Sequence, residues 1–132
     1  GALCGGYVLR DPHDGNPDVI LMASGSEVDL IYRAADILSV RGYTARLVSM
    51  PCLDLFRRQP KEYQDSVLPP ALRRRVAVEA GSTLGWHRYV GLDGAVIGID
   101  HFGASGTSKT LFTELGFTAE EVAGAALRLL GE

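Results

Sequence analysis

Five polar residues lie at or within three positions of the ends of apolar runs of the sequence, and their types could support acid–base or anion-binding chemistry. They are Ser24, Ser26, Glu79, Asp100 and His101. In an open parallel sheet the carboxyl ends of the strands lie at one edge, and ligands tend to bind there. If the apolar runs are strands, the sequence predicts that these residues form one rim, which is a candidate anion-binding or contact surface.

The serine-rich turn at the first of these positions has two interpretations. Ser24, Gly25 and Ser26 could hold a phosphate with backbone amides at the positive end of a helix. However, the fingerprints Gly-x-Gly-x-x-Gly and Gly-Lys-Ser/Thr are both absent. Glu27 follows Ser24 by three residues, which is the spacing of a capping box, and a cap already accounts for the serines. We favour the cap.

Asp100, His101 and Glu79 offer the acid and base groups that a hydrolase or an isomerase needs. A nucleophile elbow, Gly-x-Ser-x-Gly, is approached only at residues 103–106, where the spacing is wrong. Polar residues also commonly end a strand and cap the helix that follows. We therefore favour a structural role and expect no catalytic residue here.

The other reactive side chains suggest no further site. Cys4 and Cys52 belong to no Cys-x-x-Cys pair or Cys/His cluster, so no structural metal is expected. We expect Cys52 to be a buried apolar group, His13 to be solvated, and Trp86 and Tyr89 to be core and interface anchors. Two thiols and no signal peptide favour a reducing cytoplasm.

Charge and hydropathy exclude two classes of partner. The formal net charge is -3 with 22% charged residues, which is not the pattern of a protein that binds nucleic acid. No apolar run approaches the ~18 residues of a membrane span. The one basic cluster, Arg73, Arg74 and Arg75, precedes an apolar run, and we expect it to be a solvated rim. We expect neither nucleic acid nor a membrane as partner.

The elements that must position these residues alternate along the chain. The 132 residues are 46% hydrophobic, enough for one core. We expect strands at 7–9, 19–23, 43–49, 75–79 and 95–99, and helical segments at 24–41, 53–56, 60–68, around 86–89, at 109–115 and from 118. Residues 1–17 are rich in turn formers and are interpreted as a linker with an edge strand. Residues 18–132 are interpreted as one α/β domain with a mostly parallel sheet covered by helices on both faces.

Several blocks of the sequence, taken in order, resemble the C-terminal domain of bacterial-type transketolases. The blocks are residues 6–9, 21–28, 48–51, 76–81, 85–86, 97–105 and 115–120. The most specific are Ser-Gly-Ser-Glu-Val, Val-Glu-Ala-Gly and Phe-Gly-Ala-Ser, and together the blocks cover nearly the whole chain. The resemblance implies a three-layer α/β/α fold with an open sheet of about five strands, one of them an antiparallel edge strand. The chain departs from many relatives at residues 105–108, where they have an alanine-proline pair after the serine.

The resemblance also implies an enzyme. The implied enzyme is a cytoplasmic homodimer that transfers a two-carbon ketol unit between sugar phosphates in the pentose phosphate pathway, with thiamine diphosphate and Mg2+. In that family the cofactor, the catalytic histidines and the substrate-phosphate arginines belong to two other domains, and their motifs are missing here. We therefore expect a structural and dimer-contact domain that holds no catalytic, cofactor or metal residue. Its partners would be the other domains of its chain, and alone it would be inactive.

Two alternatives remain open. The rim at the strand ends could make the domain a regulatory binder of small anions. The chain could also be the equivalent domain of another thiamine diphosphate enzyme, such as deoxyxylulose phosphate synthase or the first component of pyruvate dehydrogenase. A start at Gly1 rather than at methionine is what we expect of a piece of a longer protein.

Overall fold

A computed structural model describes residues 4–13, 15–24, 27–79, 87–91, 93–98 and 119–131 of the chain. Its five strands form one sheet in the order β1-β3-β2-β4-β5. The strands are β1 (Tyr7–Arg10), β2 (Val19–Ala23), β3 (Ala45–Ser49), β4 (Arg75–Glu79) and β5 (Ala95–Gly98). Four of them are parallel, and β1 pairs antiparallel with β3 at one edge. The predicted fold class is confirmed.

The central strand β2 is buried on both of its faces, which explains its unbroken apolar sequence. Val19, Leu21 and Ala23 face one hydrophobic cluster, while Ile20 and Met22 face a second. Successive side chains of a strand point to opposite faces of the sheet, so one strand contributes to both cores.

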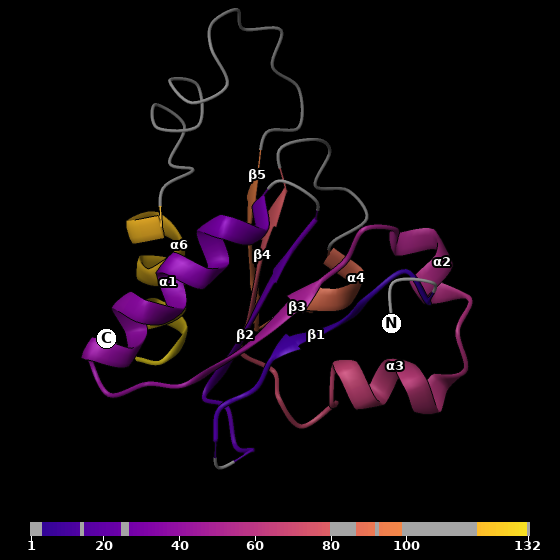
Figure 1. Cartoon of the computed structure of the whole chain (residues 1–132), viewed down its shortest axis with the longest axis horizontal. Coiled ribbons are helices and arrows are strands. Elements are labelled where there is room, and N and C mark those ends of the chain that lie inside the picture. The colour runs from indigo at the N-terminus through magenta and orange to yellow at the C-terminus, as the bar shows by residue number, and fades with distance from the viewer. Residues whose placement is uncertain are drawn as a thin grey trace, which may run out of the picture.

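Helices cover both faces of the sheet (Figure 1). One layer contains α1 (Val28–Val40) and α6 (Ala119–Leu129), which pack against each other. The other layer contains α2 (Leu53–Arg57), α3 (Lys61–Val67) and α4 (His87–Val90). In α1 the buried residues are Ile31, Ala34, Ala35 and Leu38, and this helical spacing is the one the sequence predicts.

The N-terminal segment is tied to the helices of the second layer. The backbone at Gly5 has φ +82°, and a Cβ there would lie 2.5 Å from the amide nitrogen of Phe56. The Gly5 carbonyl accepts a hydrogen bond from the Cys52 amide (3.1 Å), and the Tyr63 hydroxyl donates to the Gly6 carbonyl (2.8 Å). Glycine is favoured at position 5 because the backbone there has positive φ and lies close to another segment of backbone.

Strand β1 contains an irregularity. Tyr7 and Val8 pair with Ser49 and Val48, but the next pair joins Arg10 to Leu47, so Leu9 is the extra residue of a bulge. The Arg10 guanidinium lies over the ring of Tyr32 in α1, 5.2 Å from its centre. The edge strand therefore also contacts the first helical layer.

Two details differ from the sequence-based expectations near the helix starts. The predicted capping box does not form, because α1 begins at Val28 with Glu27 as its N-cap and without a side-chain cap bond. The Glu27 amide donates instead to the backbone carbonyl of Ser24 (3.1 Å). Cys52 was expected to be buried, and this was wrong: it is the N-cap residue of α2 and its side chain is exposed.

The remaining elements agree with expectation to within a few residues. Strand β3 begins at Ala45 rather than at Tyr43, because Thr44 is used to bind the Asp18 carboxylate with its amide (2.8 Å) and its hydroxyl (3.2 Å). The predicted helix at 109–115 and the side chain of Trp86 lie outside the described residues. No helix in the described part of the chain has both the length and the apolar character needed to cross a membrane.

Candidate functional site

The structure brings together two of the five residues of the predicted rim. Strands β2 and β4 are neighbours, with Ala23 paired to Val78, so the residues that follow these positions meet. The Ser24 hydroxyl donates to Oε2 of Glu79 at 2.5 Å, and this bond closes the carboxyl end of the sheet between the two strands. The other three, Ser26, Asp100 and His101, lie outside the described residues.

A second carboxylate lies beside the same hydroxyl. Oε2 of Glu27 is 3.4 Å from the Ser24 Oγ, and the Glu27 residue is only 4% exposed. A serine hydroxyl has one proton to donate, and the shorter contact assigns it to Glu79. Two carboxylates therefore lie beside Ser24, and the Ser24 hydroxyl already has an acceptor. The arrangement is that of an internal tie between strands.

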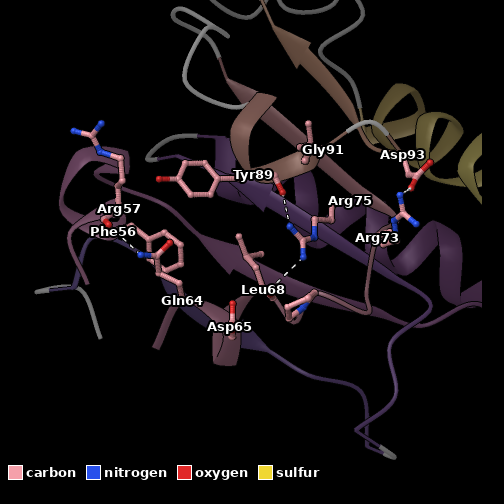
Figure 2. Close-up of a pocket in the computed structure, with 12 residues that line it drawn as sticks. Phe56, Arg57, Gln64, Asp65, Leu68, Arg73, Arg75, Tyr89, Gly91 and Asp93 are labelled. Atoms are coloured by element: carbon pink, nitrogen blue, oxygen red, sulfur yellow. Dashed lines mark hydrogen bonds and ion pairs between the residues drawn. The ribbon is translucent and has the colours of Figure 1, made fainter. Parts of the chain in front are cut away.

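A pocket of about 610 Å³ lies on the face of the sheet that carries α2, α3 and α4 (Figure 2). Phe56 and Tyr89 line it with their rings in an edge-to-face arrangement, 5.6 Å between centres. Tyr89 is buried, as predicted for a core anchor. The charged residues of the lining are Arg57, Asp65, Arg73, Arg75 and Asp93.

Arg75 is the organising side chain of this pocket, and the expectation that it belongs to a solvated rim was wrong. It is half-buried at the start of β4, and its guanidinium donates to four backbone carbonyls. The acceptors are Leu72 (2.7 Å), Tyr89 (2.6 Å), Pro69 (2.8 Å) and Leu68 (3.2 Å). Burial lowers the pKa of Arg75 and the Asp65 carboxylate partly offsets this, but an arginine remains charged at any ordinary pH.

The other polar groups of the pocket are also engaged. Arg73 pairs with Asp93 (2.5 Å), and Asp65 pairs with Lys61 of the same helix (3.0 Å). The Gln64 amide donates to the carbonyls of Arg57 (3.0 Å) and Gln59 (2.9 Å). These contacts hold α2, α3 and α4 together and present no paired nucleophile and base. The pocket is a structural junction in its observed state.

Sequence reasoning missed this junction because its contacts connect segments that are distant in the chain. The only local signal was a basic residue at the first position of a buried strand, shortly after Pro69 and Pro70. His13 is exposed to solvent, as the sequence predicted. Within the described ranges, no three His, Cys, Asp or Glu side chains gather closely enough to hold a metal ion.

Comparison with known proteins identifies the family. The profile of the family described as "Transketolase-like TK C-terminal domain" matches residues 5–118. The chain belongs to the transketolase family. It corresponds to the C-terminal domain of transketolases, as the resemblance implied.

Individual transketolases support this assignment. The chain is 53% identical to the Mycobacterium tuberculosis transketolase over 98% of its own length, and 48% identical to the chloroplastic transketolase of Solanum tuberosum over 96%. A solved transketolase structure from Pichia stipitis superposes on 98% of the chain with a TM-score of 0.86 at 38% identity. The chain spans only 19%, 17% and 18% of these three proteins, respectively. Matches of this strength favour a transketolase over the other thiamine diphosphate enzymes considered above.

Proposed function

We propose that this chain is the C-terminal structural and subunit-contact domain of a transketolase and that it does not transfer a ketol unit by itself. The observation that carries the proposal is coverage. The chain spans only about one fifth of the length of transketolases to which it is 48–53% identical. The whole enzyme would use thiamine diphosphate and Mg2+, act on sugar phosphates of the pentose phosphate pathway and be a homodimer in the cytoplasm. The two free thiols, Cys4 and Cys52, are compatible with that compartment.

The geometry of the rim supports a contact role over an anion site. Ser24 is bonded to Glu79 and flanked by Glu27, so its hydroxyl already has an acceptor. A phosphate there would have to displace these contacts, whereas a rim whose side chains are already engaged can pack against a neighbouring domain without rearranging. We propose that Ser26, Asp100 and His101 belong to the same contact surface.

The activity test uses the isolated 132-residue chain. It is incubated with saturating thiamine diphosphate, Mg2+, a ketose phosphate donor and an aldose phosphate acceptor, with a complete transketolase as positive control. We expect no turnover above the protein-free reaction. Turnover that scales with the concentration of the purified chain would refute the proposal. The coding sequence upstream of Gly1 supplies an independent check, because it should encode the cofactor-binding domains.

A second measurement separates the two roles of the rim. Phosphate is titrated into the 15N-labelled chain while the amide resonances of residues 24 and 27 are followed. A contact surface predicts no saturable shift at these positions. Saturable shifts centred on Ser24 would instead support the alternative of a regulatory anion site at the carboxyl ends of the strands.

A further inference from the structure

A second pocket, of about 790 Å³, lies at the opposite end of the sheet from the rim. Its lining includes Asp18, Arg74 and Gly94, which immediately precede β2, β4 and β5, respectively. The last turn of α6 adds Arg128. The pocket is therefore formed where the amino ends of three parallel strands meet the end of a helix.

The pocket carries an excess of positive charge. Among the described residues, three arginines line it, Arg73, Arg74 and Arg128, against two carboxylates. Both carboxylates are engaged: Asp18 accepts two hydrogen bonds from Thr44, and Asp93 pairs with Arg73. This positive excess occurs in a chain whose formal net charge is -3. We call the site the arginine pocket.

Two of the arginines have no counter-charge in the described part of the chain. Arg74, just before β4, and Arg128, in α6, make no side-chain hydrogen bond or ion pair there. Arg74 is held in place through its backbone, since its carbonyl accepts from the Ile20 amide at 2.9 Å. Arg128 passes over Gly124, where an added Cβ would lie 3.8 Å from Nη1.

A positive charge in the last turn of α6 complements the helix dipole, and this explains why an arginine stands at position 128. It does not account for Arg74, which precedes a strand. Two cations that face one pocket repel each other, and a bound anion would reverse the sign of that interaction. Guanidinium groups present planar pairs of donors that match the oxygens of a phosphate.

We propose that the arginine pocket binds a small phosphate-bearing anion, either inorganic phosphate or the phosphate group of a sugar phosphate. Arg74 and Arg128 are the ligands, and Arg73 adds a third guanidinium when it exchanges Asp93 for the anion. The site lies at the end of the sheet remote from Ser24 and Glu79, so it is separate from the rim. It adds a binding function to a domain that otherwise serves as scaffold.

The test titrates inorganic phosphate into the 15N-labelled chain at constant ionic strength, with chloride as the balancing ion. We expect saturable amide shifts at Arg74, Gly94 and Leu129. The double variant Arg74→Gln/Arg128→Gln should weaken binding about 10-fold or more, since each change removes a charge-assisted hydrogen bond. Arg33→Gln is the matched control, because Arg33 is also exposed but lies on α1 and is paired with Asp29 at 3.0 Å. Its affinity for phosphate should equal that of the parent chain.

A sugar phosphate titrated in parallel distinguishes the two sources of the anion. Equal affinities assign recognition to the phosphate group, and tighter binding of the sugar phosphate assigns further contacts to the sugar. Shifts that do not saturate, or equal affinities for the double variant and the parent, would overturn the proposal. If the isolated chain does not fold, the complete polypeptide that carries it is treated with an arginine-reactive dicarbonyl. Phosphate must then protect Arg74 and Arg128 but not Arg33, and equal labelling with and without phosphate overturns the proposal.

Discussion

The guanidinium of Arg75 connects three parts of the chain that the sheet alone does not connect. It binds carbonyls of the segment between α3 and β4 and the carbonyl of Tyr89 in α4, while its own backbone belongs to β4. Four acceptors on one side chain require the fork of donors that only arginine has. Its role is to hold the second helical layer against the sheet.

Replacing Arg75 by methionine should therefore lower the free energy of unfolding by about 3 kcal/mol. The substitution keeps the apolar stem but leaves four half-buried carbonyls without their donor, and bonds to charged groups each contribute roughly 1.5–3 kcal/mol before solvent compensates part of the loss. Urea denaturation measures the change. Arg74→Met is the adjacent control, and because Arg74 is exposed we expect a change within about 0.5 kcal/mol. Similar losses for both variants would contradict the role given to Arg75.

Ser24→Ala tests the tie between the ends of β2 and β4. Removing the hydroxyl deletes the 2.5 Å bond to Glu79, and we expect a loss of about 1–2 kcal/mol in unfolding free energy. Ser39→Ala, at an exposed position of α1, should change stability by less than about 0.5 kcal/mol. The prediction fails if the two serine variants unfold at the same urea concentration.

Tyr63 makes the stability of the fold sensitive to alkaline pH. Burial raises the pKa of its phenol, and the neighbouring Cys4 thiol raises it further. The unfolded chain then releases this proton near pH 10 while the folded chain retains it, so the contribution of Tyr63 is complete below that pH and is lost as pH rises through the folded pKa.

Tyr63→Phe should consequently be less stable than the parent by about 1 kcal/mol at neutral pH, because it lacks the hydrogen bond to the Gly6 carbonyl. The difference between the two proteins should shrink as the pH rises above about 10, since only the parent has the phenol to titrate. Urea midpoints of both proteins across this range measure the effect. A difference that stays constant or widens would show that the Tyr63 pKa is not raised by folding.

Among the elements, the entry to β1 depends most on a single residue type. Gly5 has positive φ and its Cα lies against the backbone of α2, so alanine would be strained in conformation and would also collide with the amide of Phe56 and the Cβ of Leu55. Gly15 has nearly the same φ, +72°, but nothing lies within 4 Å of its added Cβ. The pair separates conformational strain from collision.

We expect Gly15→Ala to cost about 1 kcal/mol from backbone conformation alone. Gly5→Ala should cost at least about 2 kcal/mol more, because neither backbone nor Cβ atoms can move aside cheaply. Urea denaturation gives the totals, and amide exchange at Tyr7 and Val8 should accelerate only in Gly5→Ala. Equal costs would mean that the approach of the Gly5 backbone to α2 is not needed for stability.

The strands and helices of this fold are largely predictable because their signals are local. The unbroken apolar run of β2 and the helical spacing of Ile31, Ala34 and Leu38 require no knowledge of neighbours in space. The capping box failed for the opposite reason. Ser24 has the right spacing to Glu27, but Glu79 from a neighbouring strand takes its hydroxyl. Tertiary contacts decide such competitions, and one sequence does not display them.

The same limit applies to sites. A rim at the carboxyl ends follows from the topology of parallel strands, and the meeting of Ser24 with Glu79 could be predicted. The arginine pocket could not, because Arg74 and Arg128 line the same pocket only after α6 has packed against the sheet. Arg75 was likewise misassigned, since Arg73, Arg74 and Arg75 look alike in the sequence until the fold leaves the first two exposed and half-buries the third.

On the scale of the whole molecule, α6 closes one of the two cores. Its buried residues Val122, Ala123 and Ala126 belong to the cluster that includes Val19 and Leu21 of the central strand. The family profile ends at residue 118, just before this helix. The packing nevertheless makes the helix a part of the domain, because it covers one side of α1 and the part of the sheet formed by β4 and β5.

A chain that ends at residue 118 should therefore lack a cooperative unfolding transition and expose apolar surface to a hydrophobic dye. A chain that ends at residue 130 keeps α6 and serves as the control, and we expect it to unfold like the parent. Circular dichroism during urea denaturation, together with dye fluorescence, measures both. Cooperative unfolding of the shorter chain would show that α6 is dispensable.

The bulge at Leu9 affects how copies of this molecule meet at high concentration. A strand of another molecule that paired with Tyr7 and Val8 would lose its hydrogen-bonding register with β1 at Leu9. Arg10, which is exposed, would also place a charge at this edge. Fibril growth by strand addition needs an edge of even register over several residues. The regular register of this edge ends after two residues, which disfavours edge-to-edge assembly there.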